Sequence, residues 1–110
     1  MNLSPEDETW LRSYQTNLDA QFPGLVREII LFGSKARGTA NDESDLDVLV
    51  VIREGDWRVK RAVEESGYAD ASTNSVDPSI IVRTEEEWGW RRDTRAPFWR
   101  TLTRDGIALR

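Results

Sequence analysis

The sequence of 110 residues contains no cysteine and no histidine. Without cysteine, disulfides, zinc–thiolate sites and cysteine nucleophiles are excluded. Without histidine, the chain lacks the side chain most often used as a general base, and it cannot build a Ser-His-Asp arrangement. Any chemistry must therefore use carboxylates, arginine, lysine, hydroxyl groups or a bound metal.

Long apolar runs are absent as well. No run approaches the roughly 20 residues that span a bilayer, and the acidic N-terminal residues 1–8 lack the positive and apolar regions of a signal peptide. We therefore expect a cytoplasmic protein without membrane segments. A chain of this length can bury one core but not two, so we predict a single domain over residues 1–110.

Charge is unevenly distributed along the chain. Up to Val82 there are 8 basic and 15 acidic residues, whereas from Arg83 onward there are 7 arginines and 5 acids. An acidic body argues against general nucleic-acid binding. The arginine-rich C-terminal segment is either a solvated helical face or a docking surface for an acidic partner or an RNA.

The most informative stretch runs from Ile29 to Ile52. Two runs rich in β-branched residues flank a glycine-bounded turn and a polar loop, and the second run opens with Asp45-Leu46-Asp47. Because side chains alternate across a strand, Asp45 and Asp47 project from the same face. Two like charges at that separation raise a pKa unless a cation lies between them. A divalent metal such as Mg²⁺ is the usual solution, since it is held by carboxylate oxygens together with phosphates.

The turn between the two runs predicts an anion site. Gly33 lets the backbone turn sharply after a strand, and Ser34 is suited to cap a short helix. Free N–H groups at a helix start attract phosphate, and Arg37 lies one turn further on, where it can bind the same anion. A phosphate cradle facing two carboxylates is what magnesium-assisted phosphoryl or nucleotidyl transfer requires.

Purely structural readings of these residues stay open. Ser44 and Asp45 could cap a turn while Asp47 is simply exposed at a strand start, although Asp is unfavourable in strands. Ser34 could cap a helix without a ligand. Arg37 could pair with Asp42 or Glu43, and Lys35 is expected on the surface.

Hydrophobic periodicity predicts the other elements. An N-terminal helix from Ser4 and Pro5 carries a stripe of apolar side chains that we assign to the core: Trp10, Leu11, Tyr14, Leu18 and Phe22. The later elements are listed in chain order: strand 25–32, strand 45–53, helix 57–66 ended by Gly67, loop 68–75, strand 76–84, a short helix after Thr84, and a helix from Pro97 to Gly106. Pro78 lacks the donor that a central strand needs, so we expect the third strand at a sheet edge.

Gly33-Ser34, ten intervening residues and Asp45-Leu46-Asp47 together resemble the motif of the DNA polymerase β-like nucleotidyltransferase superfamily. The size and the run from Gly33 to Gly38 resemble its minimal nucleotidyltransferases, the MNT proteins. The resemblance implies an α/β (α+β) fold with a small three-stranded mixed sheet, in the order 1-2-3, and helices packed on it.

The same resemblance implies the site. Asp45 and Asp47 would hold Mg²⁺, two ions in such enzymes, and Gly33, Ser34 and Arg37 would bind the triphosphate of ATP. These enzymes use a further Asp on the third strand, which completes the metal site and takes the proton of the attacking hydroxyl. Asp77 is the only acid available there, so we assign it as catalytic residue and metal ligand. Counting back from Thr84 favours Ser79 for that position, which places Asp77 one strand repeat away, about 6–7 Å.

MNT proteins resemble antitoxins that transfer AMP to a tyrosine of partner HEPN ribonucleases. We therefore expect a Mg²⁺-dependent nucleotidyltransferase that acts as the antitoxin of a HEPN-type toxin. The alternative is a non-catalytic module that neutralises a toxin by occlusion through its arginine- and tryptophan-rich C-terminal third. Modification of a small molecule is a third and less favoured option. The acceptor, the donor base and a homo-oligomeric state stay open.

Overall fold

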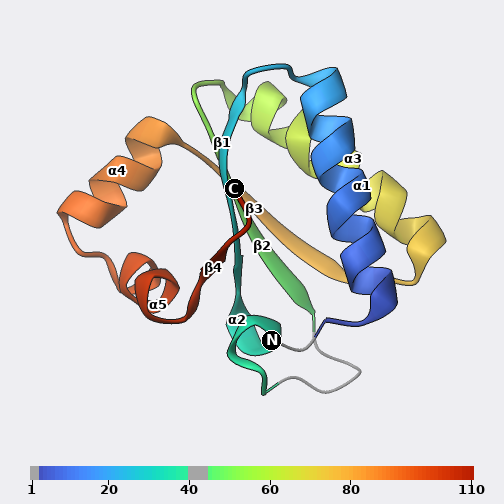
Figure 1. Cartoon of the computed structure of the whole chain (residues 1–110). Helices are drawn as coiled ribbons and strands as arrows, with labels where there is room; N and C mark the ends of the chain where they lie inside the picture. The colour runs from blue at the N-terminus through green and yellow to red at the C-terminus, as the bar shows by residue number, and fades with distance from the viewer. Residues whose placement is uncertain (1–2, 40–44) are drawn as a thin grey trace.

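A mixed sheet with helices on both faces forms the molecule (Figure 1). The computed structural model describes residues 3–39 and 45–110, without the side chains of residues 72–74. Its elements in chain order are α1 (Pro5–Gln21), β1 (Val26–Phe32), α2 (Gly33–Arg37), β2 (Leu46–Ile52), α3 (Trp57–Asn74), β3 (Pro78–Thr84), α4 (Glu85–Asp93), α5 (Pro97–Asp105) and β4 (Ile107–Ala108). The expected loop over 39–44 lies outside the described residues after Thr39.

The sheet has four strands in the order β3-β2-β1-β4. β1 is antiparallel to β2 and to β4, while β2 and β3 are parallel and joined by the α3 crossover. The predicted order of the first three strands and the edge position of β3, which begins at Pro78, are confirmed. The predicted count of three strands is wrong, because β4 adds a two-residue strand beside β1 that is too short to show a periodic pattern.

Side chains of β2 are buried on both faces of the sheet. Leu46, Val48, Val50 and Ile52 face α1 and α3, and Leu49 and Val51 face the layer of α4 and α5. All six are fully buried. β2 is therefore an inner strand that is covered on both faces, and its alternation of side chains assigns each residue to one layer.

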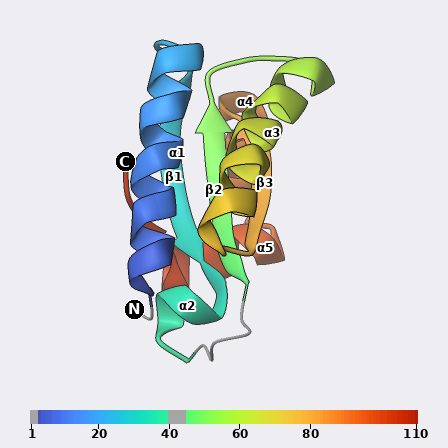
Figure 2. The same cartoon turned by 90° about the vertical axis from the view of Figure 1, so that its right-hand side faces the viewer.

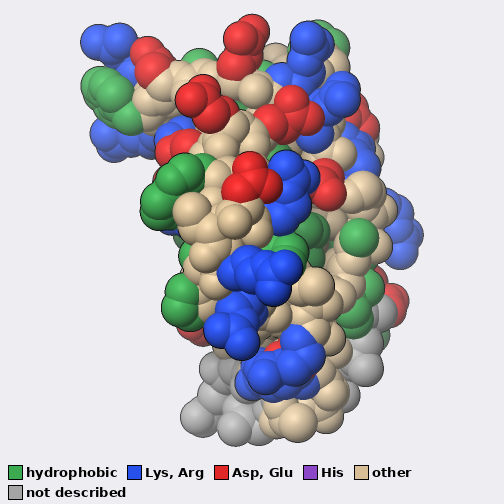
Figure 3. All heavy atoms as spheres, turned by 90° about the vertical axis from the view of Figure 1, so that its left-hand side faces the viewer, with side chains coloured by type: hydrophobic (Ala, Val, Ile, Leu, Met, Phe, Trp, Pro, Cys, Tyr) green, Lys and Arg blue, Asp and Glu red, His purple; other side chains and the backbone are tan. Residues whose placement is uncertain are grey.

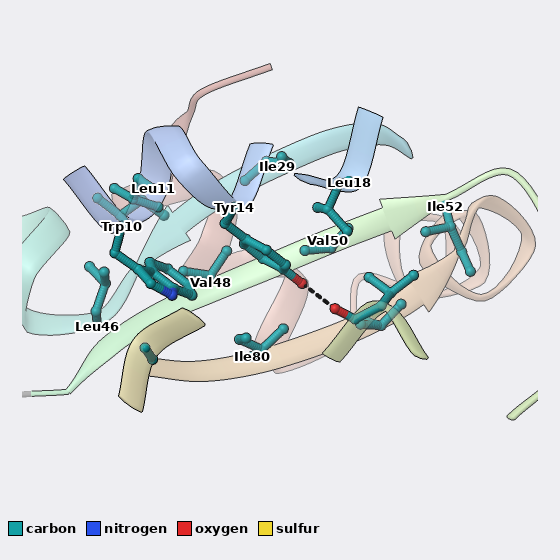
Figure 4. Close-up of a cluster of buried hydrophobic side chains, with 14 of the residues drawn as sticks. Trp10, Leu11, Tyr14, Leu18, Ile29, Leu46, Val48, Val50, Ile52 and Ile80 are labelled. Atoms are coloured by element: carbon teal, nitrogen blue, oxygen red, sulfur yellow. Dashed lines mark hydrogen bonds between the residues drawn. The ribbon is translucent and has the colours of Figure 1, made fainter. Parts of the chain in front are cut away.

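Helices α1 and α3 lie side by side on one face of the sheet (Figure 2). The predicted stripe of α1 packs onto the sheet with Trp10, Tyr14 and Leu18 fully buried (Figure 4). Two polar atoms of the stripe are satisfied by α3: Trp10 Nε1 donates to the carbonyl of Gly67 at 2.9 Å, and the Tyr14 hydroxyl donates to the carbonyl of Val63 at 2.8 Å. The apolar stripe and its hydrogen bonds thus fix α3 against α1.

The end predicted for α3 is wrong. The helix continues through Gly67 to Asn74, so residues 68–74 are helical and not a loop. A Cβ at Gly67 would lie 2.5 Å from Ile80 Cδ1 and 3.0 Å from Tyr14 Cε1. Glycine is needed here for close packing of α3 against the core, not to end the helix. Within the described part of the chain, none of the helices is long and apolar enough to cross a membrane.

Replacing Tyr14 by Phe should lower the free energy of unfolding by about 1 kcal/mol, because one buried hydrogen bond is lost while the ring remains. Burial, and then the nearby Glu64, raise the pKa of the Tyr14 hydroxyl, so it stays a donor over the ordinary pH range. Denaturant unfolding measures the loss. Arg12→Ala on the exposed face of the same helix is the control, and an equal effect of both variants would contradict this role for the hydroxyl.

Candidate active site

The turn after β1 and the start of β2 meet at one point. Phe32 pairs with Asp47 in the β1–β2 register, and Gly33 follows with a φ of 75°. A Cβ built on Gly33 would overlap Asp47 Oδ2 and would lie 3.0 Å from Asp47 Cγ. The carboxylate of Asp47 therefore lies directly against the α-carbon of Gly33, where only glycine leaves room for it.

Helix α2 presents its first backbone N–H groups beside this carboxylate. The residue before the helix is Phe32, and no side chain caps it, so the expected capping role of Ser34 is wrong: Ser34 lies inside the helix. Its carbonyl accepts the N–H of Thr39 at 3.0 Å, and Gly38 ends the helix in the left-handed conformation. The first N–H groups of a helix have no partner within it, so those of Gly33 and Ser34 suit an anion.

The two predicted metal ligands differ in environment. Asp45, just before β2, is exposed, and Asp47, the second residue of β2, is half-buried. Burial, and then the neighbouring charge of Asp45, raise the pKa of Asp47, whereas the exposed Arg37 of α2 acts in the opposite direction. The structure therefore brings Arg37 close enough to the pair to offset part of its repulsion. Asp42 and Glu43, the alternative partners of Arg37, lie outside the described residues.

The donor set of the carboxylate pair fits a hard divalent cation. Burial and the charge of Asp45 disfavour the ionised form of Asp47, and a cation between the two carboxylates would remove this effect. Over residues 3–39 and 45–110, no three Asp, Glu, His or Cys side chains come close enough to hold one metal ion. Mg²⁺ needs no such cluster, since it is often bound by one or two carboxylates with phosphates and water as the other ligands. Asp45 and Asp47 are the residues that would hold it.

The third predicted acid, Asp77, lies just before β3, where its side chain is exposed. Its carbonyl accepts the N–H of Leu46 at 3.0 Å. In the parallel ladder, Asp47 pairs with Ser79, so a hydroxyl occupies the position beside Asp47 that a carboxylate would need. Asp77 was expected within the third strand, but it lies just before β3. It is one strand repeat before Ser79 and level with the start of β2.

The expectation that Lys35 lies on the surface is wrong. Its Nζ is 2.6 Å from Asp7 Oδ2, and the two side chains are only 12% and 4% exposed. The sequence offers no signal for this ion pair, because 28 residues separate its members and Asp7 reads as an ordinary acid in the first turn of a helix.

Helix α5 forms a wall beside the site. It contacts α2 and the sheet face that carries Asp47, and it is held there by Phe98, whose ring meets that of Phe32 edge-on with the centroids 5.4 Å apart. Its exposed side carries Arg100 and Arg104. Figure 3 shows a column of basic side chains down the face formed by α4 and α5, toward the end of the molecule where α2 lies.

Comparison with known proteins gives consistent matches. A family model described as a nucleotidyltransferase domain matches residues 11–99. A protein of Methanocaldococcus jannaschii, named as a candidate protein adenylyltransferase, is 40% identical over 45 residues, which are 41% of this chain and 45% of that protein. The match thus spans less than half of that relative.

Solved structures share the fold. A toxin–antitoxin structure with AMP-PNP superposes with a TM-score of 0.60 at 19% identity, covering 94% of this chain and 73% of the other. A variant of the MntA–HpeT toxin–antitoxin pair gives 0.56 at 20% identity, covering 94% and 71%. A candidate nucleotidyltransferase from Sulfolobus solfataricus gives 0.53 at 22% identity, covering 98% and 88%. At these identities the likeness establishes the fold alone.

Gly33→Ala should destabilise the protein more than Gly24→Ala, although both glycines have a φ of 75°. The left-handed backbone costs either alanine about 1 kcal/mol. A Cβ at Gly24 meets nothing within 4 Å, whereas at Gly33 it would displace Asp47, which adds about 1–3 kcal/mol. Denaturant unfolding of both variants measures the difference, and equal losses would show that the carboxylate does not rest on Gly33.

Asp47→Asn should raise the melting temperature at neutral pH. A carboxyl whose pKa is raised on folding stabilises the folded state below its unfolded pKa, and this contribution is lost as the pH rises through the folded pKa. The gain of the variant should therefore be present at pH 7 and disappear below an ordinary Asp pKa of about 4. Thermal melts over this range measure it, with the exposed Glu54→Gln as control. A variant less stable than the wild type at pH 7 would contradict the repulsion.

Proposed function

Because the chain belongs to the nucleotidyltransferase domain family, we propose that it transfers AMP from ATP to a hydroxyl group of a partner protein in a Mg²⁺-dependent reaction. The observation that carries this proposal is the contact of the Asp47 carboxylate with the α-carbon of Gly33. It sets this carboxylate against the first backbone N–H groups of α2, and the transfer needs carboxylate-bound metal and N–H groups on the same phosphates.

The triphosphate is bound at α2. The N–H groups of Gly33 and Ser34 bind its oxygens, and the guanidinium of Arg37, which is exposed beside Asp47, neutralises part of its charge. Asp45 and Asp47 would hold the magnesium, two ions in the full site. When bound, Mg²⁺ screens the charge of the phosphates and of the leaving pyrophosphate.

The reaction is an in-line displacement at the α-phosphorus. The acceptor oxygen forms a bond to this phosphorus while the bond to the β-phosphate oxygen breaks, so pyrophosphate leaves with that electron pair. The hydroxyl proton passes to Asp77, a further carboxyl at the same edge of the sheet. Asp77 lies one strand repeat before Ser79, and Ser79 pairs with Asp47. Asp77 is therefore on the side of the acceptor where Asp45 lies.

We assign the acceptor to a tyrosine of a HEPN-type ribonuclease toxin in the cytoplasm, with this chain as the antitoxin. Two observations on other proteins support a protein acceptor and a toxin partner. The relative from M. jannaschii is named for protein adenylyl transfer, and structures of toxin–antitoxin pairs, one with AMP-PNP, share the fold.

A second function is neutralisation of the toxin by occlusion. The surface of α4 supports it, because Trp90 is 63% exposed and lines a groove with Glu86, Glu87 and Arg91. Exposed tryptophan and arginine side chains often contribute most of the binding energy at protein interfaces. This function needs neither the carboxylate pair nor ATP.

Incubation with the HEPN-type toxin proposed as its partner, labelled ATP and Mg²⁺ should label the toxin, and mass spectrometry should find AMP on a tyrosine. The Asp45→Asn, Asp47→Asn double variant should lose at least about 100-fold in rate, because it cannot hold the metal. Asp77→Asn should lose about 10²-fold or more if this carboxyl takes the proton.

Binding of the toxin by the double variant is the control, measured by gel filtration. Labelling that fails with the wild type while the complex still forms would defeat adenylyl transfer and leave occlusion. Full labelling by Asp77→Asn would remove Asp77 from the mechanism without affecting the rest.

A further inference from the structure

A nearly buried ion pair joins α2 to the start of α1. Lys35 Nζ lies 2.6 Å from Asp7 Oδ2, and little of either side chain is exposed. Asp7 is the one charged residue among the buried ones in the described part of the chain. Removing two charges from water is costly and is offset only when the charges are well paired, so the position of Lys35 is strongly tied to that of Asp7.

Asp7 is itself fixed by the start of α1. Its carboxylate accepts the N–H of Ser4 at 3.1 Å, and its own N–H donates to Ser4 Oγ at 3.0 Å, which together form a capping box. The core residues Trp10 and Tyr14 hold the rest of α1 against the sheet. The position of Asp7 is therefore fixed by the capping box and by the packing of α1, and the ion pair with Lys35 connects α2 to it.

The two basic residues of α2 point to different sides of the helix. Lys35 and Arg37 are two positions apart, which corresponds to about 200° around a helix. Arg37 is exposed, and its charge lowers the pKa of Asp47, whereas Lys35 is paired with Asp7. A helix of only five residues, Gly33–Arg37, has little stability of its own, so its orientation depends on such contacts.

We propose that the Asp7–Lys35 ion pair positions α2 for the nucleotide, so that affinity for ATP depends on a carboxylate at the start of α1 that does not touch the phosphates. This inference rests on the proposed function, since α2 is there the phosphate-binding turn. Lys35 is thus a positioning residue, and its ammonium group does not bind the triphosphate.

The direction in which Asp7→Asn changes the affinity for Mg-ATP distinguishes this role of Lys35 from direct binding of phosphate. Asp7→Asn keeps the shape and the acceptor for Ser4 N–H but removes the charge that holds Lys35. If the ion pair positions α2, Mg-ATP should bind about tenfold more weakly, because a small displacement of binding groups is costly. If Lys35 binds phosphate, its release from Asp7 should leave the affinity unchanged or increase it, and this result would overturn the proposal. Titration calorimetry with Mg-ATP measures the affinity.

Two further variants separate positioning from stability. Ser4→Ala removes the capping hydroxyl but leaves the ion pair, so it should lower the melting temperature with unchanged ATP affinity. The double variant Asp7→Asn, Lys35→Met removes both charges and should recover much of the stability lost in Asp7→Asn, while ATP binding stays weak. Wild-type affinity in this double variant would overturn the proposal even if Asp7→Asn alone fails to fold.

The two proposals fail differently. A wild-type protein that takes up no Mg-ATP refutes the nucleotide site itself and, with it, the role of the ion pair. A wild-type protein that binds Mg-ATP no better than Asp7→Asn refutes the role of the ion pair alone.

Discussion

The Asp47 carboxylate rests on the α-carbon of Gly33, and this contact joins the two halves of the site. It exists because β1 and β2 pair with Phe32 opposite Asp47, so the residue that follows β1 must turn away at the point where the carboxylate projects. Any side chain at Gly33 would separate the turn from the carboxylates. The register of the two strands thus sets the turn at Gly33 directly beside the carboxylate of Asp47.

The position of the pair on β2 explains why the site is open at one end of a buried sheet. Asp47 points to the same face as Leu49 and Val51, which are fully buried under the layer of α4 and α5, and Asp45 precedes the strand. That layer leaves the carboxylates at the start of the strand accessible. Burial and mutual repulsion nevertheless raise the pKa of Asp47, so the fold gives up some stability to hold two charges together, as functional sites often do.

Much of this arrangement could be predicted from the sequence, because it depends on local patterns. Alternation along β2 gave the two faces, and Pro78 placed β3 at the edge of the sheet. The errors concern contacts between distant segments. Gly67 looks like a helix end, yet its missing side chain serves the packing of α3 against Ile80. Lys35 looks like a surface residue, yet its partner is Asp7, and no pattern in either segment indicates the other.

The parallel register of β2 and β3 determines how many acids the site can use. Ser79 lies beside Asp47, and Asp77 lies one strand repeat earlier, exposed at the rim. In the proposed reaction, a serine in this position leaves Mg²⁺ with the carboxylates of Asp45 and Asp47, so the nucleotide would supply more of its ligands. Asp77 would then act on the acceptor and not on the metal. The proposal therefore requires the acceptor to bring its hydroxyl to the rim of the sheet near Asp77, which is exposed just before β3.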